Sequence, residues 1–251
     1  MAIQNMDRAR KDQWGAGRPS VLIFDVNETL IDVESMNGLF ERIFGDERVL
    51  REWFGHLVMY SMTITLSGLY KDFWDLGQGL FRMLGAIHNI EIKDTDVAAL
   101  KQGMMTMPGH PDVAKGLARL KEAGFRLVTL TNSPPSVGGA KSPLENAGLG
   151  RFFEKQFYIQ AARAYKPAQV AYHMVAQELD VAPGSCCMVA AHVWDTIGAQ
   201  SAGMHAALLT RPGNAPLPVD GLPQPNFVAR DLNELADKII AGWKPAGRTM
   251  A

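Results

Sequence analysis

The segment VLIFDVNETL, residues 21–30, constrains the fold of this chain more than any other stretch. Four apolar residues precede Asp25, and a turn-like sequence, residues 27–29, follows it. This pattern predicts a buried strand whose carboxyl end presents a carboxylate. Open α/β sheets bind ligands at the carboxyl ends of their strands. We therefore interpret Asp25 as a candidate nucleophile held on a rigid backbone.

After residue 107 the sequence alternates between segments typical of strands and of helices. Strands are expected at 125–131, 157–160, 186–191 and 206–210, and helices at 112–124, 167–179, 195–203 and 231–242, with a weaker helix through Gly138 and Gly139. This alternation predicts a doubly wound parallel α/β sheet, a Rossmann-like core. The carboxyl ends of its strands share one edge, where Asp25, Thr131, Asn132, Lys166 and His192 should converge.

Residues 32–107 lack the alternating pattern that is typical of strands. Apolar side chains recur there at spacings of three and four, which predicts three helices, over 49–62, 70–86 and 94–105, with Gly68 ending the first. We therefore expect a small all-helical cap, residues 32–107, inserted into an α/β core formed by residues 1–31 and 108–251.

Composition limits the possible partners. The chain has 251 residues, of which 47% are hydrophobic, enough for a full core, and its formal net charge is -1. Without a basic field, nucleic acid and membrane surfaces are poor partners, and no stretch approaches the roughly 20 apolar residues of a membrane span. Cys186 and Cys187 are adjacent in an apolar run, so we expect buried reduced thiols in a cytoplasmic protein. A partly ordered tail is expected before Ser20.

Four separated motifs together resemble those of the haloacid dehalogenase (HAD) superfamily, over nearly the whole chain. They are Asp25 followed by Thr29, Thr131 with Asn132, Lys166 before a proline, and Asp195 after a strand. A helical cap inserted after the first motif is also a family feature. The resemblance implies that Asp25 is the nucleophile, that Lys166 keeps it ionised and that Asp195 pairs with Lys166.

Two positions indicate the subclass. Phosphatases of this superfamily have a second Asp where this chain has Asn27, and they have an acidic pair where it has alanines before His192. Because Mg²⁺ needs several oxygen ligands, we expect neither a metal nor a cofactor. The pattern resembles the L-2-haloacid dehalogenases (type II). That resemblance implies hydrolysis of short L-2-haloalkanoic acids to 2-hydroxy acids through an aspartyl ester, which is covalent catalysis.

The resemblance also implies roles for other residues. Thr29 and Thr131 would orient Asp25 or bind the substrate carboxylate, and Asn132 would contact halide or substrate. Tyr172 matches a tyrosine that family members keep near the site. The remaining candidates for the substrate pocket are Asn27, Phe54, Val58 and Trp194.

This chain departs from the dehalogenase pattern as well. Members typically have a halide-binding Arg on the first cap helix, yet no Arg occurs between Arg51 and Arg82. Glu28 and His192 stand where Gly and Asn are typical, and Asn27 replaces a Tyr. Our hypothesis is that Glu28 orients His192, which acts as the general base on the water that cleaves the ester.

Simpler roles are alternatives at each position. Asp25 and Asp195 suit helix N-caps, Asn27 suits a left-handed turn, and a lone His at the end of a strand is often structural. The apolar face with Phe54 and Val58 suits packing within the cap. The alternative functions are a phosphatase or phosphonatase acting on a small phosphorylated metabolite, and an inactive HAD-like binding protein. A homodimer is possible through an apolar cap helix.

Overall fold

The computed structural model describes residues 19–136 and 138–243, so the tail expected before Ser20 lies outside it except for Pro19. Its centre is a six-stranded sheet in the order β3-β2-β1-β4-β5-β6, with all neighbours parallel. The strands are β1 (Val21–Phe24), β2 (Arg126–Thr131), β3 (Lys155–Tyr158), β4 (Cys186–Ala190), β5 (His205–Leu209) and β6 (Phe227–Ala229). The predicted doubly wound α/β fold is confirmed.

Strand β1 lies in the middle of the sheet, where the strand order changes direction. Phe24, its last residue, is level with Thr129 of β2 and Val189 of β4. The residues that follow these three strands therefore meet at one edge, and in this topology that point is where ligands bind. Asp25 stands at the centre of this edge.

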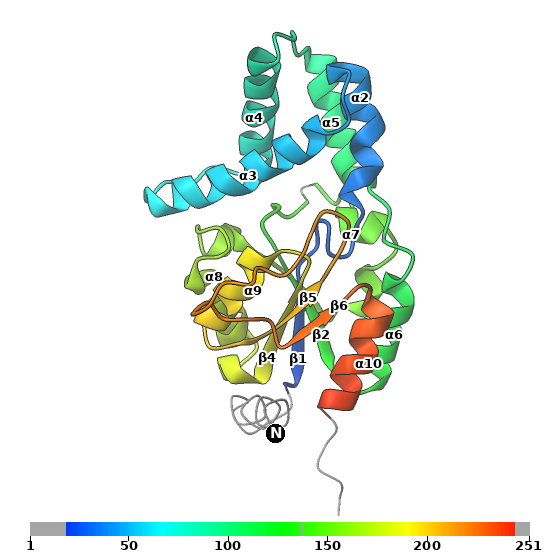
Figure 1. Cartoon of the computed structure of the whole chain (residues 1–251), viewed down its shortest axis with the longest axis vertical. Coiled ribbons are helices and arrows are strands. Elements are labelled where there is room, and N and C mark those ends of the chain that lie inside the picture. Colours follow the sequence, from blue (N-terminus) through cyan, green and yellow to red (C-terminus); the bar gives the residue numbers. More distant parts are fainter. Residues whose placement is uncertain (1–18, 137, 244–251) are drawn as a thin grey trace, which may run out of the picture.

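Helices cover both faces of the sheet (Figure 1). On one face lie α6 (Val113–Glu122) and α10 (Leu232–Gly242), and on the other α8 (Gln169–Glu178) and α9 (Val193–Ser201). Asp231 caps α10 by accepting a hydrogen bond from the backbone N–H of Glu234, as its position in the sequence favours. Gly116 lets α6 approach Leu232 closely, since a Cβ there would lie 2.5 Å from the leucine side chain.

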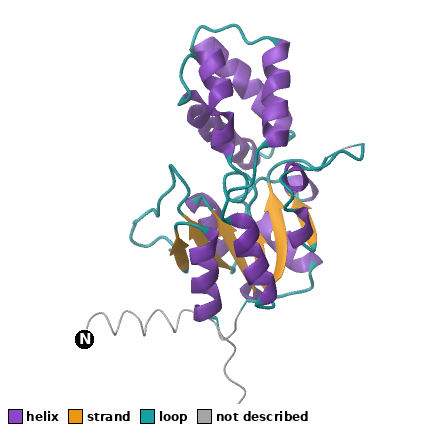
Figure 2. Cartoon of the chain, turned by 90° about the vertical axis from the view of Figure 1, so that its right-hand side faces the viewer, coloured by secondary structure: helices purple, strands orange, loops and turns teal. Residues whose placement is uncertain are grey.

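Between β1 and α6 the chain forms a separate group of helices, which stand above the carboxyl edge of the sheet (Figures 1 and 2). They are the 3-10 turn η1 (Val33–Met36), α2 (Asn37–Phe44), α3 (Val49–Leu66), α4 (Phe73–Ile87) and α5 (Asp94–Thr106). Phe40, Trp53 and Phe81 pack together at their centre, with ring centroids 5.5–5.8 Å apart. We propose residues 32–107 as the cap.

The structure corrects several expectations about individual elements. The predicted helix through Gly138 and Gly139 is wrong, because both glycines take left-handed backbone angles, φ 65° and 76°. Only the short α7 (Pro143–Asn146) forms there, after its cap Ser142. Helix α2, strand β6 and the short turns η2 (Gly150–Phe152), η3 (Ile159–Ala161) and η4 (Pro183–Ser185) were not predicted, since each is too short to show a clear period.

Two further expectations concern the membrane and the cysteines. In the part of the chain that the structure describes, no helix combines the length and apolarity needed to cross a membrane. Cys186 and Cys187 are both free and buried in β4, as the apolar run predicted.

Candidate active site

A fully buried ammonium group organises the carboxyl edge of the sheet. Lys166, in the loop before α8, donates from Nζ to Asp25 Oδ1 at 2.8 Å, Asp195 Oδ2 at 2.7 Å and the Leu130 carbonyl at 3.0 Å. All three of its N–H donors are therefore used. Burial alone would lower the pKa of Lys166, but the carboxylates of Asp195 and Asp25 outweigh burial and raise it. The ammonium stays charged beside Asp25.

The second oxygen of Asp25 is held by its own turn. Thr29 donates from Oγ1 to Asp25 Oδ2 at 2.7 Å and accepts a hydrogen bond from the backbone N–H of Ala191 at 2.9 Å. The carbonyl of Thr29 accepts two hydrogen bonds from the buried Arg211 guanidinium. Both oxygens of Asp25 therefore have fixed donors, which orient the carboxylate.

Glu28 occupies an unusual backbone position for a side chain of its size. Its φ of 67° is left-handed, a region that favours glycine, so the expectation that Asn27 takes this conformation is wrong. The Glu28 side chain is buried and bonds to three partners: His192 Nε2 at 2.6 Å, Asn214 Nδ2 at 3.0 Å and the Arg51 guanidinium. Burial raises the pKa of Glu28, but the hydrogen bonds and charges of His192 and Arg51 outweigh it and lower the pKa overall.

His192, the residue before α9, lies between Glu28 and Asp25. Its Nε2 contacts Glu28, and its buried Nδ1 has no hydrogen-bond partner and lies 3.8 Å from Asp25 Oδ2. The Glu28 carboxylate can only accept, so we assign a ring hydrogen to Nε2, and Nδ1 faces Asp25. The ring stacks on Trp194 at 5.1 Å and lies 5.7 Å from Phe54 of α3.

The other predicted residues surround this centre. Tyr172 lies behind Asp195 and donates to its Oδ1 at 2.6 Å, and burial raises the pKa of Tyr172 well above its usual range. Asn132 accepts a hydrogen bond from the Lys166 backbone, at 3.2 Å. Three more are placed as follows: Thr131 Oγ1 accepts from Ser133 N, Asn27 donates to Ser133 Oγ, and Val58 packs half-buried against the hydrophobic core.

Four residues that the sequence did not single out also hold this site. Arg51 and Asn214 contact the Glu28 carboxylate, and a ring nitrogen of His110 lies 3.0 Å from the Glu28 carbonyl. Arg211 binds the turn after β1 and also pairs with Asp112. The position of 211–214 just after the predicted strand 206–210 was a usable signal, because that strand also ends at the catalytic edge.

The donor set does not fit a magnesium ion. The oxygens of Asp25 already bond to Lys166 and Thr29, and those of Asp195 bond to Lys166 and Tyr172. Asn27 donates its amide to Ser133, and among the described residues no group of three or more His, Cys, Asp or Glu side chains is placed to hold a metal. A hard cation takes several oxygen ligands, and Asn27 stands where phosphatases of this family have one of their carboxylates.

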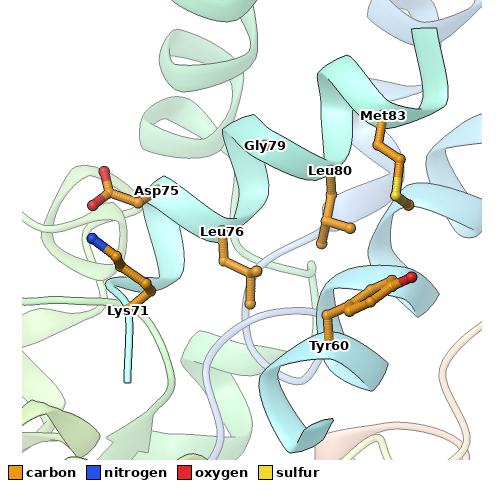
Figure 3. Close-up of a pocket in the computed structure, with 7 residues that line it drawn as sticks. All are labelled: Tyr60, Lys71, Asp75, Leu76, Gly79, Leu80 and Met83. Carbon is orange, nitrogen blue, oxygen red and sulfur yellow. The ribbon is translucent and has the colours of Figure 1, made fainter. Parts of the chain in front are cut away.

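A separate pocket of about 480 Å³ lies in the proposed cap, between α3 and α4, rather than beside Asp25. Figure 3 shows Lys71 and Asp75 at one end and Met83 at the other, with Tyr60 from α3 opposite α4. None of the predicted site residues lines this pocket, so it is distinct from the Asp25 centre.

Comparison with known proteins places this geometry among hydrolases. A family model described as haloacid dehalogenase-like hydrolase matches residues 19–203. The (S)-2-haloacid dehalogenase 4A of Burkholderia cepacia is 28% identical over 200 residues, covering 77% of this chain and 84% of the relative. The crystal structure of the L-2-haloacid dehalogenase RSc1362 superposes with a TM-score of 0.81 at 26% identity, covering 87% of this chain and 97% of the other. A phosphoglycolate phosphatase of Vibrio parahaemolyticus is 27% identical over 185 residues, covering 74% and 73%.

Proposed function

This chain belongs to the haloacid dehalogenase-like hydrolase family, and from that premise we propose that it hydrolyses the carbon–halogen bond of short L-2-haloalkanoic acids without a metal. The observation that carries the proposal is the Asp25 carboxylate, held by Lys166 and Thr29 and faced by the free Nδ1 of His192. The similarity to curated haloacid dehalogenases supports the substrate class.

In the first step, a carboxylate oxygen of Asp25 attacks C2 of the acid from the side opposite the halogen. The new bond joins the oxygen to C2, the C2–halogen bond breaks, and halide leaves with the bonding electrons. Lys166 and Thr29 fix the direction of attack, and such positioning accounts for a large share of the rate in reactions of this kind. The product is an ester of Asp25, and the configuration at C2 is inverted.

In the second step, water attacks the ester carbonyl carbon of Asp25. His192 Nδ1 takes the proton from this water while its Nε2–H remains bonded to Glu28 at 2.6 Å. Lys166 Nζ donates to the carbonyl oxygen, where negative charge develops. The bond between the Asp25 carbonyl carbon and the ester oxygen breaks, and His192 Nδ1 gives its proton to the departing alkoxide, which leaves as the 2-hydroxy acid. The second proton of the water passes from the Asp25 carboxyl to solvent, which restores the carboxylate.

The closed environment of Asp25 suits a small substrate. Phe54 and Trp194 flank His192, and Asn132 lies at the end of β2 beside the Lys166 loop. We assign substrate contact to Asn27, Phe54, Asn132 and Trp194, and orientation of the nucleophile to Thr29 and Thr131. Tyr172 and Asp195 hold Lys166 from behind.

Halide release tests the function directly. Purified protein is given L- and D-2-chloropropionate and fluoroacetate, with and without EDTA, and free halide is measured. We expect release from the L-acid that EDTA does not reduce. No release from any of the three compounds overturns the proposal. Asp25→Asn should abolish turnover, and a chain that binds the acid with no turnover would be the inactive binding protein instead.

His192→Ala separates the two steps, and it avoids Asn, which is typical at this position in the dehalogenases. The variant should release about one halide per chain and then stop, because the ester forms but is not cleaved. Intact-protein mass spectrometry should show Asp25 carrying the acid without its halogen. Steady turnover by His192→Ala at the wild-type rate would remove His192 from the mechanism while leaving Asp25 in place.

A phosphatase of the same fold is the alternative, favoured by the similarity to phosphoglycolate phosphatase. Asn27 opposes it, since its amide stands where these phosphatases have a second Asp and donates to Ser133 Oγ. Mg²⁺-dependent hydrolysis of a generic phosphate ester that is lost with EDTA would support the phosphatase.

A further inference from the structure

Arg51 joins three parts of the chain beside the proposed site. It lies in the first turn of α3, in the proposed cap, and its guanidinium contacts the buried Glu28 carboxylate. The same guanidinium donates to Glu34 Oε1 at 2.6 Å and to the Pro212 carbonyl at 3.1 Å. It packs flat against the backbone of Gly213, where a Cβ would lie 3.5 Å from Cζ. The Arg51 guanidinium is thus held by contacts with all three parts of the chain.

The charges around His192 show what this contact does. Glu28 bonds to one ring nitrogen, and Asp25 lies 3.8 Å from the other. A neighbouring carboxylate favours the protonated, charged imidazole, and a protonated imidazole cannot act as a base. Lys166 offsets the charge of Asp25, and Arg51 is the cation that offsets Glu28.

The remaining groups at this position are weaker or neutral. Glu34 pairs with Arg51, Asp195 pairs with Lys166, and a ring nitrogen of His110 lies 3.0 Å from the Glu28 carbonyl. Asn214 donates to Glu28 without charge. The neighbouring rings of Phe54 and Trp194 carry no formal charge. Arg51 is therefore the group whose charge most directly opposes the effect of Glu28 on His192.

We propose that Arg51 is a positioning residue that acts through Glu28: it fixes the carboxylate against His192 and offsets the negative charge that Glu28 places beside the ring. This inference rests on the proposed function, because it concerns the step that cleaves the ester. Since Arg51 is carried by α3, the contact exists only while the proposed cap lies against the sheet edge.

The test measures the titration of His192 directly. The imidazole signals are followed by NMR against pH in the wild type, in Arg51→Met and in Arg82→Met, and His192 is assigned by the signal missing from His192→Asn. Arg82→Met is the matched control, since it removes the same charge from another cap helix, where Arg82 pairs with Asp94. We expect the His192 midpoint to rise by about one pH unit in Arg51→Met and to stay in place in the control.

Activity provides the second measurement. The rate of ester cleavage is followed by rapid quenching and mass spectrometry at several pH values. In Arg51→Met the acidic limb of this pH profile should move by the same amount, so the rate below the midpoint falls about tenfold. Arg51→Lys, which keeps the charge, should recover most of it. If Arg51→Met does not fold, Arg51→Gln replaces it.

The outcomes separate this inference from the function on which it rests. An unchanged His192 midpoint in Arg51→Met overturns the role of Arg51, whether or not halide is released. Absence of halide release in the wild type overturns the proposed dehalogenase, and a shifted midpoint would still show that Arg51 controls the protonation of His192.

Discussion

Replacement of Lys166 by Met tests how much the ion pairs of Lys166 with Asp25 and Asp195 contribute to the free energy of unfolding. Lys166 is fully buried, and its ammonium bonds to Asp25, Asp195 and the Leu130 carbonyl at 2.7–3.0 Å. Met fills a similar volume but leaves two carboxylates without their cation. Removing one partner of a buried ion pair costs about 3–5 kcal/mol of unfolding free energy, chiefly because the other charge stays buried.

The cost should depend on pH in a fixed direction. In the wild type, Asp195 and Asp25 raise the pKa of Lys166. The stability that Lys166 contributes to the fold is therefore complete below the ordinary pKa of lysine and is lost as the pH rises through the raised value. In Lys166→Met, burial and mutual repulsion favour protonation of one carboxyl in the folded state. That state binds more protons than the unfolded one, so the variant gains stability as the pH falls. The difference from wild type should be largest at pH 7–9 and smaller at pH 5.

Urea unfolding followed by circular dichroism at pH 5, 7 and 9 measures these differences. A loss of about 4 kcal/mol corresponds to a fall of roughly 10 °C in the melting temperature for a chain of this length. Lys166→Met/Asp195→Asn should recover more than half of the loss, because only one buried charge remains. Lys155→Met, at an exposed pair with Glu178, should cost under about 1 kcal/mol. A loss at Lys166 that is equally small, or that does not vary with pH, refutes the reasoning.

Three further substitutions address single contacts. Glu28→Gly relieves the left-handed backbone, worth about 1 kcal/mol, but removes the buried partner of Arg51, His192 and Asn214, so it should cost about 2–4 kcal/mol of unfolding free energy while ester cleavage slows about 100-fold in a rapid-quench assay. Tyr172→Phe removes the 2.6 Å hydrogen bond to Asp195 and should lower the unfolding free energy by about 1–2 kcal/mol in urea titrations. Arg211→Met should cost about 3 kcal/mol at pH 7 by leaving the largely buried Asp112 unpaired. Burial raises the pKa of Asp112, but Arg211 and the Leu232 N–H outweigh burial and lower it, so this stabilisation is lost as the pH falls through that value and the cost should shrink in acid calorimetry.

The sequence predicted the elements whose pattern is long or regular. The buried strand before Asp25 and the amphipathic run that became α3 have clear periods, and alternation beyond residue 107 predicted the parallel sheet. Short elements were missed or misplaced for a physical reason. Strand β6 has three residues, and the segment at Gly138 and Gly139 follows a backbone preference that hydrophobic spacing does not report.

Within the site, motif spacing located the residues that follow strands but not their partners from loops and the cap. Asp25, Thr29, Lys166 and Asp195 come together as the motifs indicated. Arg51 was noted only as the limit of a stretch without arginine. Its contact with Glu28 depends on the angle at which α3 crosses the sheet edge, and that angle is set by packing among aromatic rings rather than by any local pattern.

The two proposed steps make opposite demands on the charge at Asp25, and the arrangement around His192 meets both. Attack on C2 needs an anionic carboxylate, which Lys166 and Thr29 provide. Formation of the ester then removes that negative charge, which lies 3.8 Å from His192 Nδ1. Loss of a nearby anion favours the neutral imidazole, so the base becomes available when water must be activated. The negative charge of Glu28 alone would oppose this change. Arg51, which contacts the other oxygen of Glu28, offsets that charge. In the proposed reaction, alkylation of Asp25 would thus prepare His192 for hydrolysis.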